Sequence, residues 1–174
     1  VLFRSSRASS RRTFSAASTN PAYFPKMTYM SVAAFEATKH NLYALQDVVT
    51  QQLQALPGSL ADAKLCGGTA LARCWLDHRA SYDLDFFFPH GFKANSLAHA
   101  LKQGEIAFEA REIIDDPYKA NQLHGTVTYS GRSLNVSFIE DAYFDVFPAV
   151  ARPMGPVVVA TEDVAGLYHR KLRT

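Results

Sequence analysis

The stretch GGTALARCWLDHRASYDLDFFF, residues 67–88, decides how the rest of the chain is arranged. A short apolar run at residues 63–66 precedes its two glycines, and a segment with apolar residues at helical spacing follows them. A second apolar run, at residues 83–88, has the length and the aromatic content of a strand. The sequence therefore predicts a strand, a tight turn, a short helix and a return to the sheet.

The glycine pair suits the binding of an anion. The N-terminus of a helix presents backbone N–H groups that have no intrahelical acceptor, and anions are favoured there. Gly67 and Gly68 have no Cβ, so a phosphate can approach their backbone closely. Thr69 can cap the helix or donate its hydroxyl to the same anion. We expect these three residues to bind phosphate.

The two aspartates of the second run are spaced to act together. Residues two apart in a strand point to the same face, so Asp83 and Asp85 leave one side of the sheet while Leu84 and Phe86 enter the other. Their Cα atoms lie about 7 Å apart in an extended strand. Two such carboxylates can converge on a hard divalent cation, which also relieves their repulsion. The pair is the predicted metal site.

A phosphate-binding turn beside a metal-binding pair of carboxylates forms the working parts of a phosphoryl or nucleotidyl transfer site. Residues 67–71, 78–81 and 83–87 resemble the signature of the AbiEii/AbiGii toxin family of nucleotidyltransferases, which have a minimal DNA polymerase β-like fold. The resemblance implies an α/β (α+β) domain over residues 27–174, with a mixed β-sheet flanked by helices. It also implies that the domain is truncated at its C-terminus relative to the family.

The resemblance further implies a metal-dependent enzyme that transfers a nucleoside monophosphate from a nucleoside triphosphate to RNA, especially tRNA, or to a protein. The expected role is that of a toxin or phage-defence component with a cognate antitoxin. Asp83 and Asp85 are the expected catalytic residues and hold Mg²⁺ or Mn²⁺. Gly67, Gly68 and Thr69 are expected to hold the β- and γ-phosphates.

Two basic residues are further candidates for binding the substrate. Arg79 directly precedes the aspartate strand and can reach a phosphate; the open alternative is a salt bridge to Asp77 or to the two strand aspartates. Family members carry a lysine in the helix that corresponds to the last one of this chain. Tyr168 stands at about that position here, and Lys171, one turn further on the same face, is the candidate. The alternative for Lys171 is a solvated residue that complements the helix dipole.

The sequence departs from the family pattern at the third metal carboxylate, which nucleotidyltransferases of this fold carry on a neighbouring strand. Asn135 and Ser137 occupy the polar face of that strand here, and neither is anionic. Glu112, Glu140 or Asp141 could substitute from nearby positions. The alternative function is therefore a catalytically degenerate module of the same fold that binds a nucleotide, RNA or a partner protein.

The other elements follow from periodicity and turn residues. We expect helices at residues 31–56, capped by Ser31, and from Asn95 or Ser96 to Gly104. Strands are predicted at residues 106–114, 123–129 and 133–139, the last two joined through residues 130–131. Three prolines at 148, 153 and 156 are expected to break the chain before a strand at 157–159, and residues 161–163 begin the last helix.

The composition indicates the number of domains, the location of the protein and the nature of its N-terminal residues. A chain of 174 residues that is 48% hydrophobic fits one domain, and no apolar run is long enough to span a membrane, so we expect a cytoplasmic protein without a membrane partner. Residues 1–26 carry five basic and no acidic residues, so the remaining chain has a net charge of −3. We expect this leader to be disordered and outside the domain; the alternative is a mitochondrial presequence.

Overall fold

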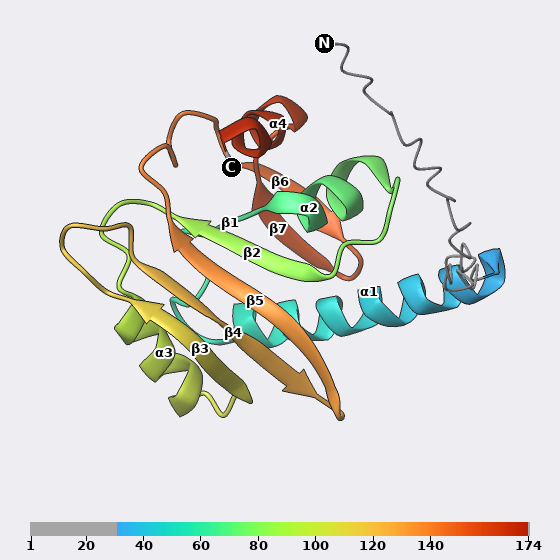
Figure 1. The fold of residues 1–174 in the computed structure, drawn as a ribbon, viewed down its shortest axis with the longest axis horizontal. Coiled ribbons are helices and arrows are strands. Elements are labelled where there is room, and N and C mark those ends of the chain that lie inside the picture. Colours follow the sequence, from blue (N-terminus) through green and yellow to red (C-terminus); the bar gives the residue numbers. More distant parts are fainter. Residues whose placement is uncertain (1–30, 174) are drawn as a thin grey trace, which may run out of the picture. The chain divides into compact units, whose positions relative to one another are not determined.

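The computed structural model describes residues 31–173 (Figure 1). The leader predicted at residues 1–26 lies outside the described residues, so its nature stays a prediction. Residues 31–174 group into one unit. This unit contains the central stretch and every predicted site residue.

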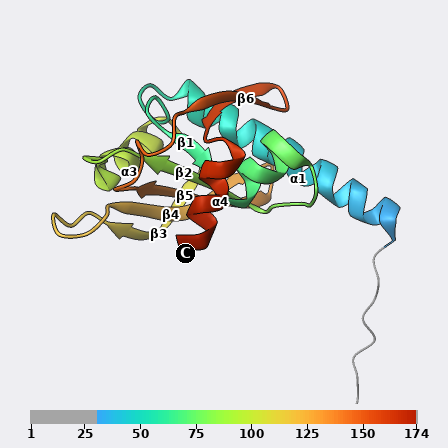
Figure 2. The same cartoon turned by 90° about the horizontal axis from the view of Figure 1, so that it is seen from above.

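The centre of the fold is a seven-stranded sheet in the order β3-β4-β5-β2-β1-β7-β6. Figure 2 shows β3, β4, β5, β2 and β1 following one another in this order. The pairs β1–β7 and β2–β5 are parallel and the others antiparallel, so the sheet is mixed, as predicted. The strands are β1 Lys64–Cys66, β2 Asp83–Phe88, β3 Phe108–Ile114, β4 Gln122–Tyr129, β5 Arg132–Glu140, β6 Val150–Met154 and β7 Val157–Thr161.

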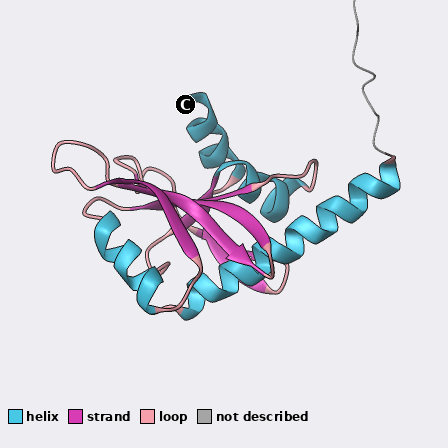
Figure 3. Cartoon of the chain, turned by 60° about the horizontal axis from the view of Figure 1, so that its bottom comes forward, coloured by secondary structure: helices cyan, strands magenta, loops and turns pink. Residues whose placement is uncertain are grey.

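Helices lie on both faces of this sheet. Helices α1 (Val32–Ala55) and α3 (Ala94–Gln103) pack on one face, and α4 (Val164–Arg173) lies on the other (Figure 3). The short helix α2 (Gly67–Thr69) continues directly into the π-helical segment η1 (Ala70–Leu76), which contacts α4. The predicted α/β architecture, with a mixed sheet between helices, is therefore confirmed.

The apolar core lies between the sheet and the first long helix. In β2, Leu84, Phe86 and Phe88 are buried and alternate with residues of the opposite face, as the sequence predicted. Phe86 stacks on Phe138 of β5 with the ring centroids 5.8 Å apart. Helix α1 begins at the predicted cap, because the Ser31 hydroxyl accepts the backbone N–H of Ala34. Burying one face of β2 in this way sends both aspartates to the other face.

The structure corrects the prediction in the proline-rich region. Residues 150–154 form β6, although the three prolines were expected to break the chain there. The strand tolerates Pro153 because β6 is at the edge of the sheet and has only one neighbour, β7. Helix α3 also begins at Ala94, slightly before the predicted start at Asn95 or Ser96. The turn at Ser130 and Gly131 joins β4 to β5 as predicted, with both residues at positive φ.

Candidate active site

The first glycine of the turn lies directly against the second aspartate. Gly67 follows β1, begins α2 and has a φ of +67°, a conformation that favours glycine. A Cβ on Gly67 would stand 2.6 Å from Oδ2 of Asp85. The turn and the aspartate strand, predicted separately, therefore meet at one point.

The second glycine lies close to the basic side chain of Arg79. A Cβ on Gly68 would stand 2.7 Å from Nη2 of Arg79 and 2.7 Å from Oγ of Ser81. The predicted alternative, a salt bridge from Arg79 to Asp77, does not form, because Asp77 pairs with Lys39 at 2.7 Å. Within residues 31–173 the Arg79 guanidinium has no acidic partner, and its hydrogen bond is a 3.5 Å contact with the carbonyl of Ala80. A positive charge therefore lies beside the N-terminus of α2.

Thr69 holds the turn to the aspartate strand. Its side chain is fully buried, and its hydroxyl donates to the backbone carbonyl of Asp83. That hydroxyl is thus engaged within the protein, while the N–H groups of the first helical turn have no intrahelical acceptor. Contacts of Gly67, Gly68 and Thr69 with a phosphate stay predictions, and the backbone of these residues is the part suited to them.

The side chains of the two aspartates lie on the same face of the sheet, and residues of the neighbouring strand, β5, hydrogen-bond to them. Asp83 is paired in register with Asn135, and Asp85 with Ser137, across the parallel strands β2 and β5. Nδ2 of Asn135 donates to Oδ1 of Asp83 at 3.0 Å, and the Ser137 side chain hydrogen-bonds to Asp85. These neutral donors lie on the polar face of β5, where the resemblance to the family predicted a third carboxylate.

Burial raises the pKa of the Asp85 carboxyl above its ordinary value, and the charge of nearby Asp83 raises that pKa further. The hydrogen bond from Ser137 and the proximity of His124 act in the opposite direction. A cation between the two aspartates would remove the repulsion. The electrostatics of the pair therefore favour a bound cation.

The suggested replacements for the third carboxylate do not complete a metal site. Glu140 accepts the backbone N–H groups of Gly91 and Asn121 and pairs with His90, while Asp141 pairs with Arg170. Within the described part of the chain, no group of three or more histidines, cysteines and acidic residues is placed to hold a metal ion. Mg²⁺ is nevertheless commonly held by one or two carboxylates together with waters and substrate phosphates. Asp83 and Asp85 fit one such ion.

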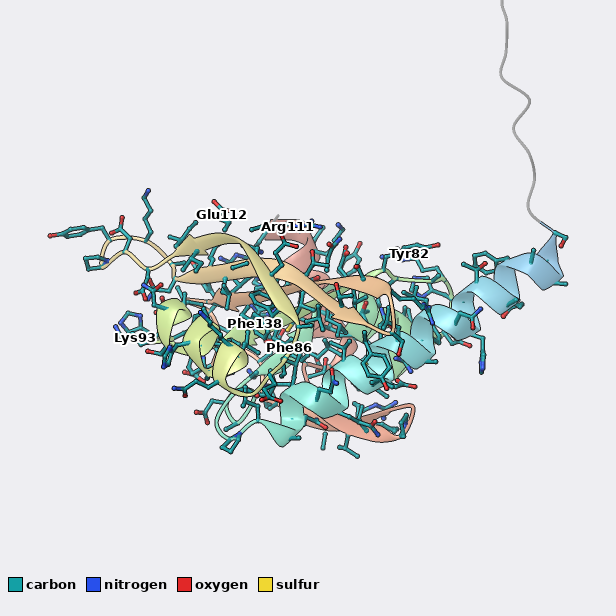
Figure 4. The ribbon with its side chains drawn as sticks, turned by 90° about the horizontal axis from the view of Figure 1, so that it is seen from below. Tyr82, Phe86, Lys93, Arg111, Glu112 and Phe138 are labelled. Atoms are coloured by element: carbon teal, nitrogen blue, oxygen red, sulfur yellow. The ribbon has the colours of Figure 1, made fainter. Side chains whose placement is uncertain are left out.

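Two residues of the site were not predicted from the sequence. A hollow of about 240 Å³ is bordered by the two aspartates and also by Arg111 of β3 and His124 of β4. Arg111 and Glu112 lie on the face of the sheet turned away from α3 (Figure 4). The polar alternation in residues 122–128 was a usable signal for His124, since these residues face the same way as Asn135 and Ser137.

The structure places Lys171 in the last turn of α4, at an exposed position. Helix α4 packs beside α2, so the element predicted to carry the phosphate-binding lysine does lie next to the glycine turn. The preceding residue, Arg170, turns inward to Glu162 and Asp141. A contact between Lys171 and a nucleotide stays a prediction.

A mixed sheet whose glycine turn meets an aspartate pair places this chain in the class of nucleotidyltransferase folds. The chain belongs to the AbiEii family: residues 53–174 match the family described as nucleotidyl transferase AbiEii toxin, type IV toxin–antitoxin system. The resemblance predicted from residues 67–87 is thereby confirmed. No protein of curated function matches the sequence significantly.

Two of the solved structures that resemble this fold come from Helicobacter pylori. The protein JHP933 is 15% identical with a TM-score of 0.48, and the alignment covers 78% of this chain and 56% of that one. A candidate nucleotidyltransferase is 17% identical with a TM-score of 0.46, and the alignment covers 78% and 58%. This chain thus spans less than two thirds of the length of either protein. None of the helices within residues 31–173 is long and apolar enough to cross a membrane.

Proposed function

We propose that this chain is a divalent-metal-dependent nucleotidyltransferase that transfers a nucleoside monophosphate from a nucleoside triphosphate to an acceptor hydroxyl. The observation that carries the proposal is the contact of the Gly67 turn with Asp85, because it joins a phosphate-binding element to a metal-binding element. Membership of a family of toxin nucleotidyltransferases supports it. The proposed acceptor is RNA, with tRNA foremost, or a protein, and the proposed partner is a cognate antitoxin.

Each side chain has a definable task in this reaction. The N–H groups at the start of α2 and the guanidinium of Arg79 bind and orient the triphosphate tail. Asp83 and Asp85 hold Mg²⁺ or Mn²⁺, and Asn135 and Ser137 keep the two carboxylates in place by donating hydrogen bonds to them. A bound Mg²⁺ offsets the charge that develops on the phosphates and favours loss of the acceptor proton.

The transfer balances without a further reactant. The acceptor oxygen forms a bond to the α-phosphorus, the bond from that phosphorus to the bridging oxygen breaks, and pyrophosphate leaves. The acceptor proton passes to a base or to water. The residues at the glycine turn retain the leaving group in line with the attacking oxygen, which is how this class of reaction gains most of its rate.

The first test is calorimetric titration of each nucleoside triphosphate, with Mg²⁺, into the full chain and into the double variant Asp83→Asn/Asp85→Asn. Binding that requires Mg²⁺ and that the double variant abolishes would support the proposal. The matched control is Asp62→Asn/Asp145→Asn, which removes two exposed aspartates outside the site. Equal binding by both double variants would contradict the proposal.

The second candidate function is a catalytically degenerate binding module of the same fold. The neutral residues Asn135 and Ser137 beside the aspartates favour it. Nucleotide labelled in the α-phosphate separates the two functions: an enzyme transfers the label to an acceptor and releases unlabelled pyrophosphate, whereas a binding module shows Mg²⁺-dependent binding alone.

A further inference from the structure

The hollow beside the aspartates has a second side that the proposed nucleotide site does not use. Asp83 and Asp85 of β2 form one border, and Arg111 of β3 and His124 of β4 form the opposite one. Strand β5 lies between them, and its polar side chains at the hollow, those of Asn135 and Ser137, are short. An acceptor that presents its hydroxyl to the aspartates would rest on this opposite border.

A β-bulge turns Arg111 toward this hollow. The register between β3 and β4 shifts between Ala110, which pairs with Gly125, and Glu112, which pairs with His124. Arg111 is the extra residue, and such bulges re-aim a side chain. Within residues 31–173 its guanidinium forms no hydrogen bond and no ion pair. It is therefore available for an anionic group, and guanidinium binds phosphate through two parallel hydrogen bonds.

His124 offers a complementary contact. It lies in the same cross-strand row as Ser137 and Asp85, and its Nε2 is 2.8 Å from Oε1 of Gln122. Because that amide oxygen of Gln122 accepts, Nε2 of His124 is the donor in this hydrogen bond, and Nδ1 is the ring nitrogen that remains for a second partner. A hydroxyl group is the natural partner of Nδ1.

We propose that Arg111 and His124 form the acceptor subsite, in which Arg111 binds a phosphate and His124 a ribose hydroxyl of the terminal nucleotide of an RNA chain. The inference rests on the proposed nucleotidyl transfer and names its acceptor. A protein hydroxyl would leave the guanidinium of Arg111 without a partner. Glu109 and Glu112 on the same strand keep the surrounding surface acidic, so the subsite takes one phosphate rather than a long stretch of backbone.

The test is fluorescence anisotropy of a ten-nucleotide RNA of mixed sequence, labelled with fluorescein at its 5′ end, with the full chain in Mg²⁺. Each titration is run with and without a non-hydrolysable nucleoside triphosphate. The variants are Arg111→Gln, Arg111→Lys and His124→Phe, and thermal unfolding checks that each is folded. Lys93→Gln is the matched control, because Lys93 is exposed and lies at the start of α3, on the other side of the sheet (Figure 4). All variants carry the same basic leader, so its contribution to RNA binding is common to them.

We expect Arg111→Gln to weaken RNA binding about tenfold and Arg111→Lys to weaken it less, since a charge-assisted contact is lost in the first and partly kept in the second. His124→Phe should weaken binding of the RNA but not of a DNA of the same sequence. RNA affinities of Arg111→Gln and Lys93→Gln that are equal would overturn the inference, as would preferential binding of a serine-containing peptide. Calorimetry of the parent protein tells the failures of the two proposals apart. Absence of Mg²⁺-dependent nucleotide binding by the parent would overturn the proposed function, whereas nucleotide binding by the parent together with unchanged RNA affinity of Arg111→Gln would overturn this inference alone.

Discussion

Gly67 and Asp85 lie in contact across the junction of β1 and β2, so close that a methyl group on Gly67 would stand 2.6 Å from the carboxylate oxygen of Asp85. The two residues are 18 positions apart in the sequence and meet because β1 and β2 pair antiparallel, with Cys66 opposite Asp85. The contact couples the start of α2 to the orientation of the proposed metal ligand. Changes at Gly67 should therefore be felt at the metal site.

Gly67→Ala should abolish Mg²⁺-dependent nucleotide binding. The new methyl group must displace the Asp85 carboxylate, and alanine at positive φ costs about 1–2 kcal/mol in addition. Gly58→Ala is the matched control, because Gly58 has a φ of +75° and no atom within 4 Å of the position of a Cβ. Urea unfolding should show a similar loss of stability from the backbone strain in both variants, and calorimetry should show lost nucleotide binding only for Gly67→Ala. Equal nucleotide affinities for the two variants would refute the coupling.

Arg79→Gln should lower nucleotide affinity about tenfold and leave the free energy of unfolding within about 0.5 kcal/mol, because the side chain is exposed and makes no ion pair among the described residues. Arg73→Gln should behave in the opposite way. The Arg73 side chain is 5% exposed, pairs with Asp47 at 2.6 Å and lies over the ring of Tyr43. Its loss should cost about 3 kcal/mol of stability.

Both variants are measured in two ways: calorimetry gives their nucleotide affinity, and urea unfolding gives their stability. The assignment of Arg79 to the phosphates would be abandoned if Arg79→Gln bound the nucleotide as tightly as the parent. A parallel loss of stability in both variants would instead indicate that Arg79 has a structural role.

Arg170→Gln should destabilise the protein by about 3–5 kcal/mol. Its guanidinium binds the carboxylates of Glu162 and Asp141 and lies over the ring of Phe87, and these acidic partners hold its pKa above the ordinary value, against the effect of burial. Glu162 is completely buried, so removing the arginine leaves its carboxylate with Lys64, 3.7 Å away, as its remaining ion-pair partner. The measurement is the midpoint and slope of urea unfolding.

Arg173→Gln on the same helix is the control for this prediction, because Arg173 is exposed, stacks on Tyr143 and forms no ion pair within residues 31–173. It should change stability by less than about 1 kcal/mol. Similar losses for the two variants would mean that the buried cluster does not hold α4 in place.

Glu140→Gln should reduce the loss of stability that the protein undergoes as the pH falls into the acid range. Burial acts to raise the pKa of the Glu140 carboxyl, but the N–H groups of Asn121 and Gly91, together with His90, lower it on balance. A lowered folded-state pKa contributes stability that is fully present above the unfolded-state value of about 4.3 and is lost as the pH falls through the folded value. The variant should therefore be less stable than the parent at pH 7, and the difference should shrink below about pH 4.

Urea unfolding between pH 7 and pH 2.5 measures this difference. Glu36→Gln, at the exposed start of α1, is the control and should follow the parent at every pH. A Glu140→Gln variant whose stability stayed below that of the parent by a constant amount down to pH 2.5 would contradict the linkage.

Local patterns in the sequence were sufficient for the elements that carry the chemistry. The alternation in residues 83–88 predicted that both aspartates leave the same face, because side chains in a strand change sides at every residue. The glycine pair predicted a turn into a helix, and Ser31 predicted the start of α1, because these depend on contacts within a few residues. The same local reasoning failed at β6, where pairing with β7 at the edge of the sheet overrides the effect of Pro153.

The sequence by itself thus determined the family, the mixed sheet and the two halves of the candidate site. Tertiary structure decided how those halves meet and what surrounds them. It brings Gly67 into contact with Asp85 and engages the Thr69 hydroxyl in a hydrogen bond to β2. It also places Arg111 and His124 beside the aspartates. The physical reason is that strand order and a one-residue bulge set these contacts. Both arise from pairing between segments distant in the chain, which local periodicity does not encode.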